Sequence, residues 1–146
     1  MIPYFRQQKQ YTCGPATMRM VLASCGVKKS EKEVVKFMST SDKKGTFNAA
    51  FPRAAERFRL NYVVQRDASI RDVKWALEEG YRIIIAYFLD EEQLAHYAVL
   101  TKIDKQGVHL LDPLYPKRKC LPMTYFVNRW HGFVDPDRHW FFGVKK

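Results

Sequence analysis

The stretch that most constrains the fold of this chain is residues 11–22, which read YTCGPATMRMVL. Apolar side chains recur at the spacing of one helix face, at Met18, Val21, Leu22 and Cys25. Pro15 suits the first turn of such a helix, because the N–H that proline lacks would be unpaired there anyway. Gly26 supplies the left-handed residue that commonly ends a helix. The pattern therefore predicts a helix over residues 13–24 with one face buried in a core.

Cys13 stands at the expected N-terminus of this helix. Unpaired N–H groups and the helix dipole favour an anion at that position, and the thiolate is the nucleophilic form of cysteine. Gly14, directly after it, allows another backbone to approach closely, such as that of a bound substrate. A free cysteine is more often a small buried hydrophobic residue. Cys25 fits that role better because it lies on the apolar stripe, so Cys13 is a candidate nucleophile.

The composition indicates one globular domain over residues 1–146. Of the 146 residues, 47% are hydrophobic and 14% aromatic, which is enough to build a core. The N-terminus has no signal pattern, and the longest apolar run, residues 83–89, is far shorter than the ~18 residues of a membrane span. We therefore expect a soluble, unexported, cytoplasmic chain without a membrane segment.

The cysteines and charges exclude several classes of protein. The three cysteines have an odd total and no C-x-x-C spacing, so neither a disulfide framework nor a zinc site is expected, and no cofactor is called for. The net charge is +10, but lysine and arginine are scattered apart from residues 117–119. Scattered charge is typical of a solvated surface, so we expect no nucleic-acid partner. The excess of positive charge favours an acidic substrate or an anionic partner.

Capping signals predict three more helices. Ser30 with Glu33, and Ser69 with Asp72, form capping boxes. A third helix is expected from Thr46, which can cap it, to about residue 58, and Pro52 should delay its start or kink it. The residues expected on its inner face are Phe47, Phe51, Ala54, Ala55 and Phe58.

The part of the chain after Gly80 is rich in strand-forming residues. The run at 81–89 is nearly continuous in apolar residues, which predicts a central strand. Further strands are expected at 61–65, 96–103, 108–111 and 138–144, with a basic loop after 113 and a short helix at 124–130. Helices first and antiparallel strands second predict an α+β fold.

His96 and Asp112 are the partners expected for Cys13. A cysteine enzyme needs a base for its thiol and a group that orients the base. His96 opens a strand directly after a polar loop, and Asp112 closes the next strand. A tight turn at Gly107 makes these strands antiparallel, so the end of one meets the start of the other. The ordinary alternatives are a structural histidine and an aspartate that begins a turn before proline.

Gln7 is the candidate donor for the oxyanion. It lies six residues before Cys13 in an apolar lead-in that begins at residue 2 and is expected to dock and position it. A side-chain amide there can donate to the oxyanion together with the backbone N–H of Cys13. Gln8 and Gln10 are competitors for this role, and a solvent-exposed polar run is the simpler explanation.

These features together resemble the papain-like bacteriocin-processing cysteine peptidases, which cut leader peptides after a double glycine. The resemblance rests on Gln7, on Cys13-Gly14-Pro15-Ala16 opening a helix, on His96-Tyr97-Ala98-Val99 and on Asp112-Pro113. It extends from Gln7 to about Trp130 and is closest to the stand-alone peptidase-like domains of that family. The transporter-linked members also carry membrane-spanning segments, and many have an acidic residue where this chain has Thr12.

The resemblance implies a papain-like fold, with N-terminal helices packed on an antiparallel β-sheet. It also implies a thiol protease in which Cys13 is the nucleophile, His96 the base, Asp112 its orienting residue and Gln7 the oxyanion donor. The expected substrate is a peptide or protein, and the reaction passes through an acyl-enzyme. Two alternatives stay open: an acyltransferase, as in the related phytochelatin synthases, and a catalytically idle peptide-binding module. Candidate walls of the substrate site are Trp75, Trp130, Trp140 and Tyr97, each of which suits a core equally well.

Overall fold

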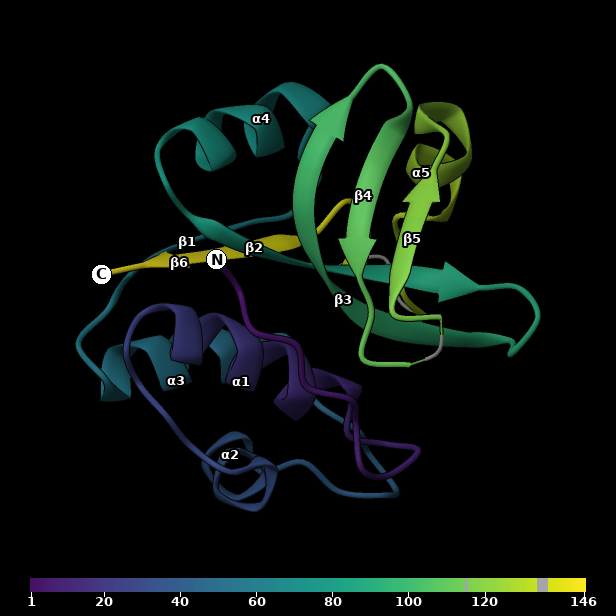
Figure 1. Cartoon of the computed structure of the whole chain (residues 1–146). Helices are drawn as coiled ribbons and strands as arrows, with labels where there is room; N and C mark the ends of the chain where they lie inside the picture. The colour runs from purple at the N-terminus through teal and green to yellow at the C-terminus, as the bar shows by residue number, and fades with distance from the viewer. Residues whose placement is uncertain (115, 134–136) are drawn as a thin grey trace.

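The computed structural model describes residues 1–114, 116–133 and 137–146. Figure 1 shows that the N-terminal part of the chain forms helices and that its C-terminal end is a strand of the sheet. The elements in order are α1 (Cys13–Ser24), α2 (Glu31–Met38), α3 (Ala50–Arg57), β1 (Asn61–Gln65), α4 (Ile70–Glu78), β2 (Arg82–Leu89), β3 (Leu94–Asp104), β4 (Gly107–Leu111), β5 (Arg118–Leu121), α5 (Met123–Arg129) and β6 (Phe141–Lys145). The α+β prediction is confirmed.

A six-stranded antiparallel sheet forms the centre of the molecule, in the order β1-β6-β2-β3-β4-β5. β2 lies inside the sheet, as its apolar run predicts, because a strand buried on both faces must be apolar at successive positions. Helices α1, α2 and α3 gather on one side of the sheet, and α4 and α5 lie on the other (Figure 1). Each side has its own hydrophobic core.

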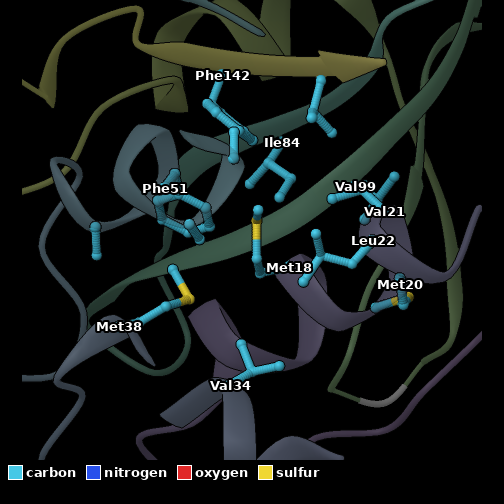
Figure 2. Close-up of a cluster of buried hydrophobic side chains, with 14 of the residues drawn as sticks. Met18, Met20, Val21, Leu22, Val34, Met38, Phe51, Ile84, Val99 and Phe142 are labelled. Atoms are coloured by element: carbon cyan, nitrogen blue, oxygen red, sulfur yellow. The ribbon is translucent and has the colours of Figure 1, made fainter. Parts of the chain in front are cut away.

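Helix α1 is the centre of the first core. Met18, Val21 and Leu22 are fully buried, and Figure 2 shows them among side chains of the neighbouring helices and of the sheet, including Ile84 and Val99. The burial extends around most of the helix rather than along one stripe. Burying a large aliphatic side chain contributes roughly 1.5–3 kcal/mol. The start of α1 is therefore held firmly against the sheet.

The capping boxes at Ser30 and Ser69 are both present, and Gly26 has the predicted positive φ of 85°.

The third helix begins later than predicted: α3 starts at Ala50, so Pro52 falls in its first turn, where it is tolerated. Thr46 does not cap it, and Phe47 is 61% exposed instead of facing inward. Proline at position 52 therefore moved the helix start rather than bending the helix.

The basic segment after residue 113 is not simply a loop. Residues Arg118–Leu121 form β5, an edge strand that pairs with β4. Its polar side chains hide the strand pattern in the sequence, and charged residues are common on edge strands because they oppose further pairing. The last strand begins at Phe141, three residues later than predicted. Among the residues that the structure describes, none of the helices has the length and apolar character needed to span a bilayer.

Candidate active site

The first element of the site is the N-terminus of α1, where Cys13 is the first helical residue and Thr12 the N-cap. Cys13 is half-buried and lines an open pocket of about 370 Å³. Thr12 does not cap the helix with its side chain; its hydroxyl is bound to Lys9 at 2.9–3.0 Å instead. Cys13 therefore lines the pocket from a position where helix N–H groups favour a negative charge.

Gly14 is required by a protein contact rather than by space for substrate. A Cβ added at Gly14 would lie 2.5 Å from Oγ1 of Thr46. Thr46 in turn is hydrogen-bonded to Thr40 at 2.7 Å. The close approach expected at Gly14 is thus made by the loop before α3, and this loop forms one wall of the pocket.

His96 and Asp112 lie together, with His96 Nε2 2.6 Å from Asp112 Oδ1. Both residues are buried, at 3% and 0% exposure. His96 is the third residue of β3 and Asp112 directly follows β4. Cys13 and His96 line the same pocket, and Cys13 is among the neighbours that raise the pKa of the His96 ring. The structure thus joins His96 to Asp112 and places Cys13 at the same pocket as His96.

A β-bulge in β3 decides which side of the sheet Asp112 faces. From the turn, the register pairs Asp104 with Gly107 and Ile103 with Val108, which would place Asp112 opposite Val99. A shift between Leu100 and Lys102 changes the register by one residue. Continuing the shifted register sets Asp112 opposite Ala98, two positions from His96 on the same face. The predicted meeting of the two residues therefore depends on a bulge that the prediction did not include.

Asp112 is held by more partners than the sequence suggested. Its Oδ2 accepts a hydrogen bond from the Tyr87 hydroxyl and lies 3.2 Å from the Lys119 ammonium. Its Oδ1 also accepts from the backbone N–H of Leu114 at 2.8 Å. A fully buried carboxylate needs such partners, since burying an unpaired charge is very costly. The sequence does not identify Tyr87 or Lys119 as partners of Asp112. Tyr87 pairs with His96 across β2 and β3, so these two side chains lie on the same face of the sheet.

The two buried groups shift each other's titration. Burial alone lowers the pKa of His96, but the hydrogen bonds to Asp112 and Cys13 and their negative charges raise it to about 9. Burial raises the pKa of Asp112, but the hydrogen bond and charge of His96, the hydrogen bond from Tyr87 and the charge of Lys119 together more than offset it, so the net direction is downward. Both groups are therefore charged near neutral pH.

Gln7 occupies a different environment from the one predicted for an oxyanion donor. It is buried, and its amide N–H groups donate to the carbonyls of Lys9 at 2.8 Å and Gln10 at 3.2 Å. Its Oε1 is buried without a hydrogen-bond partner among the described residues. Gln10 lines the pocket with Cys13, and Gln7 does not. The oxyanion role of Gln7 stays a prediction, with Gln10 as its competitor.

The lead-in docks against the segment that follows β4. The Tyr4 hydroxyl donates to the carbonyl oxygen of Asp112 at 2.7 Å, and the Gln7 N–H donates to the carbonyl of Pro113 at 3.0 Å. These bonds join the segment before Cys13 to the segment after β4, so they fix two parts of the site that are far apart in the sequence.

The pocket beside Cys13 is lined by several parts of the chain. They are Gln10 and Tyr11 before α1, the loop before α3, Ala86 of β2, the beginning of β3, and Gly132, Phe133 and Asp137 near the C-terminus. Of the predicted wall residues, Tyr97 lines the pocket. Trp130 and Trp140 are buried in the two cores, and Trp75 is half-exposed on α4. Within the described ranges, no group of three or more His, Cys, Asp or Glu side chains is arranged to hold a metal ion.

The architecture is that of the papain-like C39 peptidase domains. The structure matches the peptidase domain of Streptococcus ComA, a bifunctional ABC transporter involved in quorum sensing, with a TM-score of 0.80 at 18% identity over 100% of both chains. It also matches a double-glycine-motif protease from an AMS/PCAT transporter, solved in complex with the leader peptide, with a TM-score of 0.74 at 18% identity over 100% of this chain and 93% of the other.

The sequence matches the model of the Peptidase_C39 like family over residues 1–136, and the chain belongs to this family. It is 32% identical over 108 residues to an uncharacterised protein of Methanothermobacter marburgensis, which covers 74% of this chain and 69% of the other. It is 28% identical over 131 residues to the lactococcin-A transport/processing ATP-binding protein LcnC of Lactococcus lactis, covering 88% of this chain. That match spans only 18% of the length of LcnC.

Proposed function

We propose that this protein is a cysteine peptidase or amidohydrolase that acts through Cys13, His96 and Asp112. The observation that carries the proposal is the bridging position of His96. One ring nitrogen, Nε2, is bound to the buried carboxylate of Asp112, and the ring also lies close to Cys13 at the helix N-terminus. Because Asp112 occupies Nε2, Nδ1 is the nitrogen left for the sulfur.

In this reaction the Cys13 thiolate attacks the carbonyl carbon of an amide and forms a tetrahedral oxyanion. The backbone N–H of Cys13 and a side-chain amide, from Gln7 or Gln10, stabilise the oxyanion. His96, protonated near neutral pH, gives its proton to the leaving amine, and the carbon–nitrogen bond breaks to leave a thioester. Water then attacks the thioester and gives a proton to His96, which releases the carboxylic acid and restores the thiolate and the protonated imidazole.

Membership of the family and the names of similar proteins support a peptide substrate. LcnC is a transport and processing protein, and one structure with the same fold was solved with a leader peptide bound. The open pocket beside Cys13 supports the same conclusion, since a peptide can approach Cys13 while the protein stays folded.

Selective labelling tests the nucleophile. At about pH 6 an ordinary thiol is protonated and reacts slowly with iodoacetamide, whereas an activated thiolate reacts fast. We expect Cys13 to be alkylated well before Cys120, which is exposed, and before Cys25, which is buried. Equal rates at Cys13 and Cys120, measured by peptide mass spectrometry, would count strongly against an activated Cys13.

Product analysis tests the reaction. A peptide library incubated with the protein and analysed by mass spectrometry is expected to yield hydrolysed products that disappear in the Cys13→Ala variant. Transfer of the acyl group to an added amine in preference to water would identify an acyltransferase. Peptide binding with no turnover in either protein would identify an idle binding module. Gln7→Ala and Gln10→Ala, compared in the same assay, show which amide supports the oxyanion.

A further inference from the structure

The pocket beside Cys13 contains a carboxylate that the proposed reaction does not use. Asp137 lines this pocket together with Cys13 and His96. It is half-buried, and its Oδ1 accepts a hydrogen bond from the Asn48 side-chain amide at 2.8 Å. Among the ion pairs of residues 1–114, 116–133 and 137–146, none joins Asp137 to a lysine or arginine. Its charge is therefore available to a ligand in the pocket.

A chain of hydrogen bonds fixes where this carboxylate lies. The Tyr97 hydroxyl donates to Oδ1 of Asn48 and also contacts the carbonyl of Thr46 at 3.1 Å. Since the Asn48 oxygen accepts from Tyr97, its NH₂ group is the end that faces Asp137. On the other side, a Cβ added to Gly132 would lie 2.4 Å from Asp137 Oδ2, so the carboxylate sits directly against that backbone. The group is positioned rather than freely solvated.

Aromatic side chains surround the same space. Four of them line the pocket: Tyr11, Phe47, Tyr97 and Phe133. Phe47 is 61% and Phe133 70% exposed, which is costly for large apolar side chains unless something covers them. The faces of aromatic rings attract cations as well as apolar chains. A ligand with an apolar stem and a positive end would satisfy both the rings and the carboxylate.

The other charges of the pocket do not cancel this preference. Lys44 also lines the pocket, but it is exposed and its ammonium can remain in water. His96 is paired with Asp112 at 2.6 Å, so its positive charge is already opposed. Burial raises the pKa of Tyr97, and its neighbours Cys13 and Asp137 raise it further, which agrees with the position of Asp137 close to the Tyr97 ring. The scattered surface charge of +10 has the opposite sign.

We propose that this pocket binds a lysine or arginine side chain of the peptide substrate, at a residue close to the scissile bond, with Asp137 as its counter-charge. The inference rests on the proposed function, since it names the substrate that Cys13 acts on. It also opposes the expectation of an acidic substrate drawn from the net charge. Asp137 acts here on specificity, and the rings of Phe47 and Phe133 contact the stem of the bound side chain.

Peptide binding to the Cys13→Ala protein tests this inference without requiring turnover. The probes are blocked pentapeptide libraries in which one position at a time is fixed as arginine, citrulline, norleucine or glutamate. At one position we expect the arginine library to bind roughly tenfold more tightly than the library with citrulline, its uncharged analogue. A charge-assisted hydrogen bond is stronger than a neutral one by enough to change the dissociation constant by about that factor. Glutamate at that position is expected to bind most weakly.

Substitution of the carboxylate locates the effect. Asp137→Asn keeps the acceptor for Asn48, so the fold should be retained, and it is expected to abolish most of the preference for arginine over citrulline. Asp137→Lys is expected to reverse the preference toward glutamate. Asp42→Asn is the matched control, since Asp42 is exposed, lies near the same loop and does not line the pocket. It should leave the preference at its full value.

The outcomes separate this inference from the proposed function. Equal binding of the arginine and citrulline libraries at every position would overturn the inference, whether or not peptides are cleaved. A preference for arginine that persists in Asp137→Asn would overturn it as well. A preference that depends on Asp137 in a protein that never cleaves peptides would support the binding site and overturn the peptidase.

Discussion

The molecule contains two groups that each consist of a lysine, an aspartate, a histidine and a cysteine. The inner group is Lys119, Asp112, His96 and Cys13. The outer group is Lys102, Asp104, His109 and Cys120, on β3, β4 and β5 at the edge of the sheet. In both, a lysine lies 3.2 Å from the aspartate, and the aspartate lies within 3 Å of a histidine nitrogen.

The two groups differ in how the histidine is used. In the outer group, Nε2 of His109 faces both Asp104 at 2.9 Å and the sulfur of Cys120 at 3.8 Å. One nitrogen cannot be oriented by a carboxylate and exchange a proton with a thiol at the same time. In the inner group, Nε2 of His96 contacts Asp112, and Nδ1 is not engaged by that carboxylate. The inner geometry is therefore the one compatible with the proposed proton transfer between an oriented imidazole and the sulfur of Cys13.

Burial is the second difference. The side chains of His96 and Asp112 are 2% and 0% exposed, against 24% and 30% for His109 and Asp104. Acidity does not separate the groups: the hydrogen bond from His109 lowers the pKa of Asp104 to about 2, and the pKa of Asp112 is lowered as well. The comparison teaches that matching residue types and a lowered aspartate pKa are weak signals of a catalytic site. Desolvation and two-sided use of the imidazole are stronger ones.

Removal of the sulfur is the largest expected difference between the groups. Cys13→Ala should lower the rate of peptide cleavage by roughly 10³-fold or more, because no covalent intermediate can form. Cys120→Ala should leave the rate unchanged. The check is cleavage of the best library peptide by each variant under identical conditions. A comparable loss in Cys120→Ala, with the protein still folded by circular dichroism, would contradict the assignment.

Removal of the aspartate is expected to have the next largest effect. Asp112→Ala should lower the cleavage rate on the order of 10²-fold, because His96 loses the group that orients it. The variant also leaves Tyr87 and Lys119 without their buried acceptor, so the melting temperature should fall. Asp104→Ala, at the exposed edge, should change neither quantity appreciably. Equal effects of the two substitutions on cleavage would show that Asp112 has no special role.

The pH dependence of stability distinguishes the two histidines. The pKa of His96 is raised from 6.5 to about 9 in the folded protein, so its contribution is fully present below pH 6.5 and is lost as the pH rises through about 9. The loss should amount to about 3 kcal/mol of unfolding free energy. Denaturant unfolding between these pH values should show the decline in the native protein and in His109→Gln. His96→Gln should flatten it; an undiminished decline in that variant would contradict the pairing.

Much of the fold could be predicted because its signals are local. The helix at Cys13, both capping boxes, the β2 strand and the hairpin at Gly107 each depend on residues within a few positions. Strand β5 was missed because its sequence is polar and its partner is β4. Its order depends on a distant strand, which a local pattern does not contain.

The residue types of the candidate site could be proposed from the sequence, but the contacts around them could not. The one-residue bulge after Leu100 moves Asp112 to the side of the sheet that His96 faces. No residue type near Leu100 predicts this bulge. Lys119 and Tyr87 meet Asp112 only through the pairing of several strands. Asp137 reaches the pocket from the far end of the chain. Such contacts follow from register and topology, which sequence spacing alone leaves open.

The smallest expected effect concerns the two lysines. Lys119 lies 3.2 Å from Asp112 and 3.0 Å from the Tyr87 hydroxyl, and its charge helps to lower the pKa of Asp112. Lys119→Met should lower cleavage only severalfold, since Asp112 keeps His96, Tyr87 and a backbone N–H as partners. The lowered pKa of Asp112 gives stability that is present above its unfolded value and is lost as the pH falls through the folded one. Without Lys119 that loss should begin at a higher pH.

The matched variants decide whether Lys119 acts through its charge. Lys119→Arg keeps the positive charge and should restore both the rate and the acid limb of the stability curve. Lys102→Met removes the lysine of the outer group, whose side chain is 64% exposed, and should change neither. If Lys119→Met and Lys102→Met behave alike, the ammonium beside Asp112 has no electrostatic role. Because solvent screens the exposed pair and not the buried one, a difference between them would show that burial separates the inner group from the outer.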